Sequence, residues 1–197
     1  MKVAFGWKAH SGWAALVAVG EDDGDLVVTE RRRIELVEDA WAKQPYHAAE
    51  GQQPKTARDL VTRGIAQTTR VATRELRAAI KREQTRGNRV VASAVLTGSP
   101  MPDWTTDQIL AVHFRMHKAE GVLFRAVLAQ ATHACGLKLV AIPERELGAY
   151  AEKTLRKPGQ ALNEKIAQMG KAAGPPWGKD QKDAAVAALI ALQPRLK

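Results

Sequence analysis

His113, His117 and Glu120 are the residues whose types and spacing most directly suggest chemistry. Spacings of four and three residues place side chains on one face of an α-helix, where two imidazoles and a carboxylate can meet. At about 100° per residue, Glu120 and His113 fall inside the apolar arc of this segment and His117 falls at its border, so we expect partial burial. Because a buried carboxylate is costly when it is unpaired, Glu120 is predicted to have a partner.

Three interpretations of this group are open. A histidine paired with Glu120 would suit general acid–base catalysis. Two imidazoles and the carboxylate converging on one ion would form a mixed nitrogen and oxygen site suited to zinc, manganese or iron. A structural polar pair would instead hold the helix against its neighbour.

A second HxAEG sequence begins at His47, directly after Pro45 and Tyr46. Breaking residues surround it, so we expect a loop or at most one helical turn, and we do not interpret it as a repeat. A proline-stiffened loop could place Tyr46 and His47 against the sheet or against the helix that carries Glu120. His47 is therefore a candidate partner for that carboxylate.

Asp180 and Asp183 stand three residues apart at the start of KDQKDAAVAALIAL. Such acids can serve as a helix N-cap and a first-turn acid, because both positions favour negative charge. Asp183 lies one turn into the helix and is the better candidate for a metal ligand.

Basic and aromatic residues suggest a polyanionic partner. The formal net charge is +9, from 30 basic and 21 acidic residues, and a strongly basic chain favours nucleic acid, although spread charges also fit a solvated surface. Trp104 and Trp177 follow proline-rich turns near lysines, an arrangement that can stack unpaired bases or simply anchor a loop to the core. Lys179 follows Trp177, and His10 lies at a predicted hairpin tip.

The composition bounds the class of protein. A chain of 197 residues with 45% apolar and 26% charged residues suits one domain spanning 1–197. No apolar run approaches a membrane span and the first residues lack a signal-peptide core, so we expect a cytoplasmic protein. The single Cys135 is interpreted as structural.

The pattern of apolar residues predicts the elements that must position these side chains. Two strands flank a turn at 10–12, and a third follows the acidic loop EDDGD. A helix is predicted over 55–86, then the buried strand RVVASAVLTG, a helix from about 105 to 134 and the strand LKLVAI. Helices are predicted from Pro143, over ALNEKIAQMGKAAG, and over the final KDQKDAAVAALIAL.

This order resembles the ribonuclease H-like superfamily and, within it, the RuvC-type resolvases. The residues that carry the resemblance are the hairpin with Ser11, Gly12 and Trp13, the strand RVVASAVLTG with its following Ala-rich helix, and the Asp-containing start of the last helix. The resemblance implies an α/β fold with a mixed five-stranded sheet, three antiparallel strands and then two parallel ones, flanked by helices. It also implies phosphodiester hydrolysis with two divalent metals, magnesium or manganese, held by carboxylates of strand one, strand four and the last helix.

The sequence departs from that pattern in two of the three places. Strand one carries Gly6, Trp7 and Lys8 where an aspartate would stand, the fourth strand ends in Thr97 with no glutamate, and only Asp180 and Asp183 match.

Two hypotheses follow from this partial match. The first is a divergent metal-dependent phosphodiesterase in which Asp183 and Glu120 bind the metal, with His113, His117 and Asp180 completing the catalytic set. The second is a non-catalytic module that binds nucleic acid or a protein partner. The predicted nucleic-acid contacts are Lys8, His10, Trp104, Trp177 and Lys179. The 105–134 helix is also a candidate homodimer face.

Overall fold

A computed structural model describes residues 1–193 and shows a five-stranded sheet with the strand order β3-β2-β1-β4-β5. The first three strands form an antiparallel meander, and β4 and β5 add parallel to β1. This is the mixed ribonuclease H-like sheet that the sequence predicts. The strands are β1 (Lys2–His10), β2 (Trp13–Asp22), β3 (Asp25–Glu35), β4 (Arg89–Thr97) and β5 (Lys138–Pro143).

Two tight turns set the register of the meander. Gly12 has φ +83° between β1 and β2, and Asp23 and Gly24 both have positive φ between β2 and β3. Two successive residues of positive φ match the twist of the adjoining strands, which favours Asp-Gly at such a turn. The hairpins therefore form where local turn chemistry predicts them.

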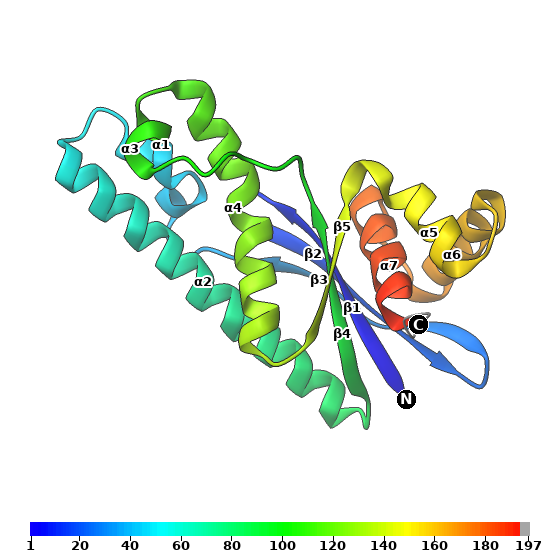
Figure 1. The fold of residues 1–197 in the computed structure, drawn as a ribbon. Helices are drawn as coiled ribbons and strands as arrows, with labels where there is room; N and C mark the ends of the chain where they lie inside the picture. The colour runs from blue at the N-terminus through cyan, green and yellow to red at the C-terminus, as the bar shows by residue number, and fades with distance from the viewer. Residues whose placement is uncertain (194–197) are drawn as a thin grey trace.

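Helices cover both faces of the sheet (Figure 1). One face is covered by α2 (Pro54–Thr85) and α4 (His113–Ala134), with the short α1 (Pro45–Ala49) and α3 (Thr106–Leu110) beside them. The other face is covered by α5 (Leu147–Leu155), α6 (Gly159–Ala173) and α7 (Lys179–Leu192). Two 3-10 turns, η1 (Ala40–Lys43) and η2 (Glu144–Glu146), complete the elements. Across residues 1–193, no helix combines the length and apolar character needed to cross a membrane.

The alternation of β1 divides its side chains between two cores. Phe5 and Trp7 belong to the core under α2 and α4, whereas Ala4 belongs to the core under α7. Gly6 shares the α7 face, where an added Cβ would overlap the carbonyl oxygen of Ala184. The missing side chain lets α7 pack closely against the strand. Because strand side chains alternate with a period of two, Lys8 also projects toward α7.

The helix predicted over 105–134 is divided in two. α3 begins with a capping box between Thr105 and Gln108 and ends at Leu110, and Val112 is extended, with φ −140° and ψ 112°. No glycine or proline marks this break, so the hydrophobic pattern runs through it undetected. Because of this break, α4 begins at His113, and its first turns do not continue the axis of α3.

Candidate functional site

The ammonium group of Lys8 lies between two carboxylates at the edge where β1, β4 and β5 end. Its Nζ atom is 2.7 Å from Oε1 of Glu144 and 2.7 Å from Oδ2 of Asp183. Lys179 Nζ lies 2.6 Å from the same Asp183 oxygen, and Arg125 lies 3.2 Å from Oε2 of Glu144. We call these five residues the lysine cluster.

Four elements bring the lysine cluster together. Lys8 lies near the end of β1, Glu144 directly follows β5, and Asp183 lies one turn into α7. Parallel strands end at the same edge of the sheet, so the residues that follow them converge there. This principle could have identified Glu144 from the sequence, because it lies two residues after the end of the last predicted strand, LKLVAI.

The surroundings favour the charged forms of Lys8 and Glu144. Burial alone would lower the pKa of Lys8, but its hydrogen bonds and charge interactions with Asp183 and Glu144 outweigh burial and raise that pKa. Burial alone would raise the pKa of Glu144, and the hydrogen bonds and charges of Lys8 and Arg125 outweigh it and lower that pKa. Three cations face two carboxylates, so the cluster has a formal charge of +1.

The lysine cluster does not fit the two divalent metals that the fold resemblance implies. Metal-assisted phosphodiester hydrolysis needs carboxylate oxygens that are free to bind the ions. Here Lys8, with a side chain only 7% exposed, takes one oxygen of each acid at 2.7 Å. A metal ion in that position would be repelled by the ammonium, and β4 ends in Thr97 instead of an acid. The cation between these two carboxylates is supplied by the chain.

Asp180 has a different partner, His10. His10 Nε2 lies 3.1 Å from Asp180 Oδ1, an ion-pair distance without hydrogen-bond geometry. The imidazole stacks on Trp13 with centroids 4.3 Å apart, and the Arg33 guanidinium lies 3.8 Å from that ring. The N-cap of α7 is Gly178, so Asp180 is a first-turn acid and not the cap.

A groove of about 1040 Å³ adjoins the lysine cluster. The Thr97–Pro100 loop after β4, the middle of α4 and the start of η2 form its sides. Its charged lining residues are Arg125, Glu144, Arg145, Glu146 and Lys179. Among the residues that the structure describes, Arg145 makes no ion pair with a carboxylate. The groove therefore offers a cation that no acid of the described chain neutralises.

The two predicted stacking tryptophans differ in what they contact. Trp177 donates from Nε1 to the carbonyl oxygen of Ile166 at 3.1 Å and packs against Gly170, so it anchors the loop before α7. Trp104 is partly buried against the core beside α3, with the cations of Arg115 and Lys118 at 4.8 and 5.9 Å from its ring. Neither tryptophan is among the groove's lining residues.

Glu120 has the partner that its burial requires, and that partner is His47. The carboxylate, 4% exposed, lies 2.7 Å from His47 Nδ1 and accepts the His47 backbone N–H at 3.1 Å. His113 and His117 stand beside this pair, with their Nε2 atoms 3.2 Å apart. We call His47, His113, His117 and Glu120 the histidine cluster.

The structure does not bring Glu120 and Asp183 together. Glu120 is carried by α4 on one face of the sheet, and Asp183 by α7 on the other (Figure 1). A single metal bound by both acids is incompatible with this placement. The spacing rules place residues on a helix face, but they do not say which face of the sheet each helix covers.

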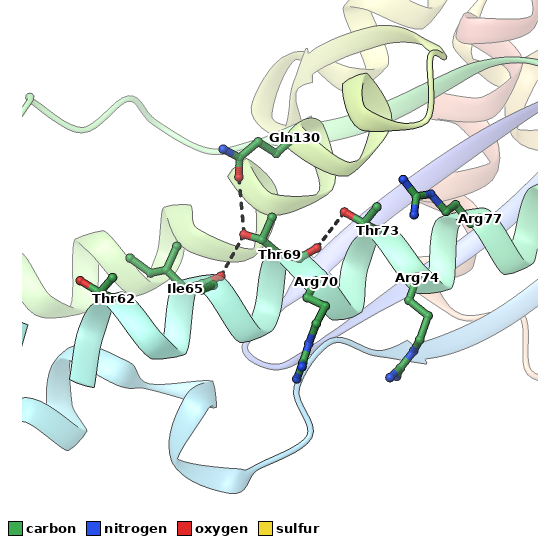
Figure 2. A pocket seen from close by; sticks show the side chains of 9 residues that line it. Thr62, Ile65, Thr69, Arg70, Thr73, Arg74, Arg77 and Gln130 are labelled. Carbon is green, nitrogen blue, oxygen red and sulfur yellow. Dashed lines mark hydrogen bonds between the residues drawn. The ribbon is translucent and has the colours of Figure 1, made fainter. Parts of the chain in front are cut away.

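A second concave feature, of about 780 Å³, runs along α2 beside Gln130 of α4 (Figure 2). Figure 2 shows Arg70 and Arg74 pointing away from Gln130, and both guanidinium groups pair with Glu38 at 2.8 Å. The Thr69 and Thr73 hydroxyls donate back to carbonyl oxygens of the same helix at 2.9 and 2.8 Å. These polar groups have partners within their own surroundings. The feature along α2 therefore presents no convergent set of reactive side chains among the described residues.

Two solved structures are similar to this chain over nearly its whole length, and the second, with a TM-score above 0.5, supports the fold. The chain is similar to RuvC of Thermus thermophilus, with 13% identity and a TM-score of 0.48 over 95% of this chain and 92% of that one. It is also similar to T. thermophilus RuvC in complex with Holliday junction substrate, with 12% identity and a TM-score of 0.51 over 96% of this chain and 92% of that one. No protein-family model and no curated protein matches the sequence. The chain has a RuvC-like, ribonuclease H-like fold.

Proposed function

We propose that this protein binds nucleic acid at the carboxyl edge of its sheet and does not hydrolyse phosphodiesters by a two-metal mechanism. The observation that carries the proposal is the position of Lys8, whose ammonium lies 2.7 Å from both Glu144 and Asp183. It provides positive charge beside the groove and occupies the carboxylates that a nuclease of this fold would need for metals.

The charge of the groove supports a polyanionic ligand. Its three basic lining residues, Arg125, Arg145 and Lys179, outnumber its two acids, Glu144 and Glu146, and the whole chain has a formal net charge of +9. Neutralising phosphates with such cations releases counterions, which supplies affinity without sequence specificity. The RuvC structure with a Holliday junction substrate gives a precedent for DNA bound to a protein of this fold.

The predicted contact residues take different roles in this proposal. Lys179, with a side chain 77% exposed, and Arg145 contact phosphates. Lys8 acts from behind the groove, because it is buried and its ammonium faces inward. His10 and Trp104 remain predicted contacts outside the groove, whereas the indole N–H of Trp177 is already used within the protein.

We also propose a homodimer and a cytoplasmic location. The homodimer would form through α4, the main part of the predicted 105–134 helix. One face of α4 is buried against α2 and the sheet, whereas Phe114 near its start is 71% exposed. A cytoplasmic location is compatible with a nucleic-acid ligand. Neither is needed for binding at the groove.

The decisive experiment measures binding and cleavage on the same samples. Fluorescence anisotropy with labelled single-stranded, duplex and four-way junction DNA, and with RNA, would be recorded over a range of salt. We expect binding that weakens as salt rises, and a salt slope reduced by about one unit for each of Arg145→Ala and Lys179→Ala. Arg89→Ala, at the opposite end of β4, is the matched control and should leave the slope unchanged.

Cleavage of the same probes would be followed with magnesium or manganese beside an EDTA control. We expect intact probes in every case. Metal-dependent cleavage that is lost in both Glu144→Gln and Asp183→Asn would show a divergent nuclease and overturn the non-catalytic assignment. The absence of salt-sensitive binding to any probe would refute a nucleic-acid role.

A further inference from the structure

Three imidazoles meet between α1 and the start of α4, on the side of the sheet opposite α7. His113 and His117 come from successive turns of α4, and His47 comes from the middle of α1. Their ring centroids are 4.5 to 5.1 Å apart. One ring nitrogen from each lies within 4.8 Å of the other two.

Two carboxylates determine which ring nitrogen is available to a ligand in two of the three histidines. Glu120 lies 2.7 Å from Nδ1 of His47, and Glu50 lies 3.3 Å from Nδ1 of His113. A carboxylate that accepts the Nδ1–H leaves Nε2 with a lone pair, which is how metal-binding histidines are oriented in proteins. The Nε2 atoms of His47 and His113 are thereby the ones available to a ligand.

The Nε2 atom of His47 is buried and has no hydrogen-bond partner within residues 1–193. A buried polar atom without a partner costs free energy, and its presence in a native structure needs a physical reason. Gln44 and the His47 backbone N–H also bind Glu120, so the ring is held in place on its other side. A bound ion would satisfy this nitrogen.

The geometry points to a first-row transition metal ion, with zinc as the reference ion, bound by His47, His113 and His117. Tetrahedral zinc with bonds of about 2.0–2.1 Å places its nitrogen ligands about 3.4 Å apart. The Nε2 atoms of His113 and His117 are already 3.2 Å apart. His47 completes the set after a small movement of its side chain.

The ligand types select the class of ion. Imidazole nitrogen suits zinc, copper, nickel and iron, whereas magnesium and calcium require oxygen ligands. Glu120 is not a ligand here: it orients His47 from behind, because its oxygens already accept hydrogen bonds from that ring and backbone. Since His113 and His117 are exposed, a fourth position remains open to water or another small ligand.

A purely structural network explains the cluster less well. One histidine would be enough to pair with Glu120, and His47 already does so. Of the two further rings, His113 pairs with the exposed Glu50 and His117 meets His113 at 3.2 Å, and neither ring pairs with Glu120 among the described residues. Three rings converging on one point are explained by a cation between them.

The test is zinc binding by the full chain, prepared without a histidine tag, measured by competition with a chromophoric chelator. We expect one zinc ion per chain, and a loss of affinity of at least a hundredfold in each of His47→Ala, His113→Ala and His117→Ala. His133→Ala, which removes an exposed histidine from the last turn of the same helix, should bind as the unmodified chain does. Cys135→Ser excludes a contribution from the thiol.

Glu120→Gln separates orientation from ligation. Loss of a carboxylate that orients a ligating histidine lowers metal affinity by about ten- to a hundredfold. We expect that loss in Glu120→Gln, with one ion still bound and the visible spectrum of tetrahedral Co²⁺ retained. Circular dichroism without metal checks that each variant is folded.

Three results would overturn the proposal. One is the absence of zinc binding to the folded, unmodified chain. Another is a zinc affinity in the three single-histidine variants that equals the affinity of the unmodified chain. The third is magnesium binding with the same affinity as zinc, because that would indicate a general attraction of cations instead of an imidazole site.

Discussion

The lysine cluster is centred between β1 and α7, whereas the histidine cluster is carried by α1 and α4, and the two clusters pair their buried charges with different partners. In the first, Glu144 and Asp183 receive cations from the chain itself, chiefly from Lys8. In the second, one buried acid is matched by three imidazoles, of which only His47 contacts it. We infer from this comparison that the number of acids in a cluster does not decide whether it can bind a metal. What decides it is whether a cation of the protein already fills the centre.

The largest expected effect is the loss of Lys8. Lys8→Met leaves Glu144 and Asp183 paired only with Arg125 and Lys179, so the loss should fall below the value of about 3–5 kcal/mol that breaking a fully buried ion pair costs. Urea unfolding measures the loss of stability. Millimolar magnesium should restore part of it in Lys8→Met and have no effect on the unmodified chain, because only the variant opens the space between the two acids. Equal stability of the two proteins would show that the cluster is not held by Lys8.

Zinc should stabilise the folded protein by binding to the histidine cluster. A ligand present at about 100 times its Kd stabilises the folded state by about 2.7 kcal/mol, so thermal unfolding should shift upward on addition of zinc. His117→Ala should lose the shift and Lys8→Met should keep it. If the zinc-induced shift were instead lost in Lys8→Met, the zinc would be bound at the lysine cluster and the proposed histidine site would be refuted.

Acidic pH should weaken the ion pairs of the lysine cluster, whereas mildly basic pH should leave them intact. Glu144 has a pKa below its ordinary value of 4.5, so its stabilising contribution is present above about pH 4.5 and is lost as the pH falls through the lowered pKa. Lys8 has a pKa above 10.5, so its contribution is lost only as the pH rises through that raised value. Glu144→Gln should therefore lose less stability than the unmodified chain when urea unfolding is repeated from pH 5 to pH 3. An identical loss in both proteins would contradict this assignment.

The smallest effect is expected for Lys179, the exposed member of the lysine cluster. Its side chain is 77% exposed, and it pairs with Asp183 four residues along the same helix. Such surface pairs contribute about 0.3–0.5 kcal/mol. The loss in free energy of unfolding, measured with urea, should therefore be several-fold smaller in Lys179→Ala than in Lys8→Met. A comparable loss in both variants would mean that burial does not distinguish the two lysines.

Local patterns predicted most of the elements because their causes are local. Strand alternation, the Asp23-Gly24 turn and the apolar stripe of α2 depend on residues near one another in the sequence. The division of the 105–134 segment at Val112 was missed because no breaking residue stands there. The topology then followed from element order and the family resemblance.

The sequence by itself determined the strands and most of the helices, and the chemical types at the carboxyl edge of the sheet, including the lysine where the fold's acid would stand. Only the tertiary structure decided the partners: Lys8 with Asp183, 175 residues away, and Glu120 with His47, 73 residues away. It also decided that Glu120 and Asp183 lie on opposite faces. Helical and strand periods fix the direction of a side chain relative to its own element, whereas partners across elements depend on how the apolar faces pack.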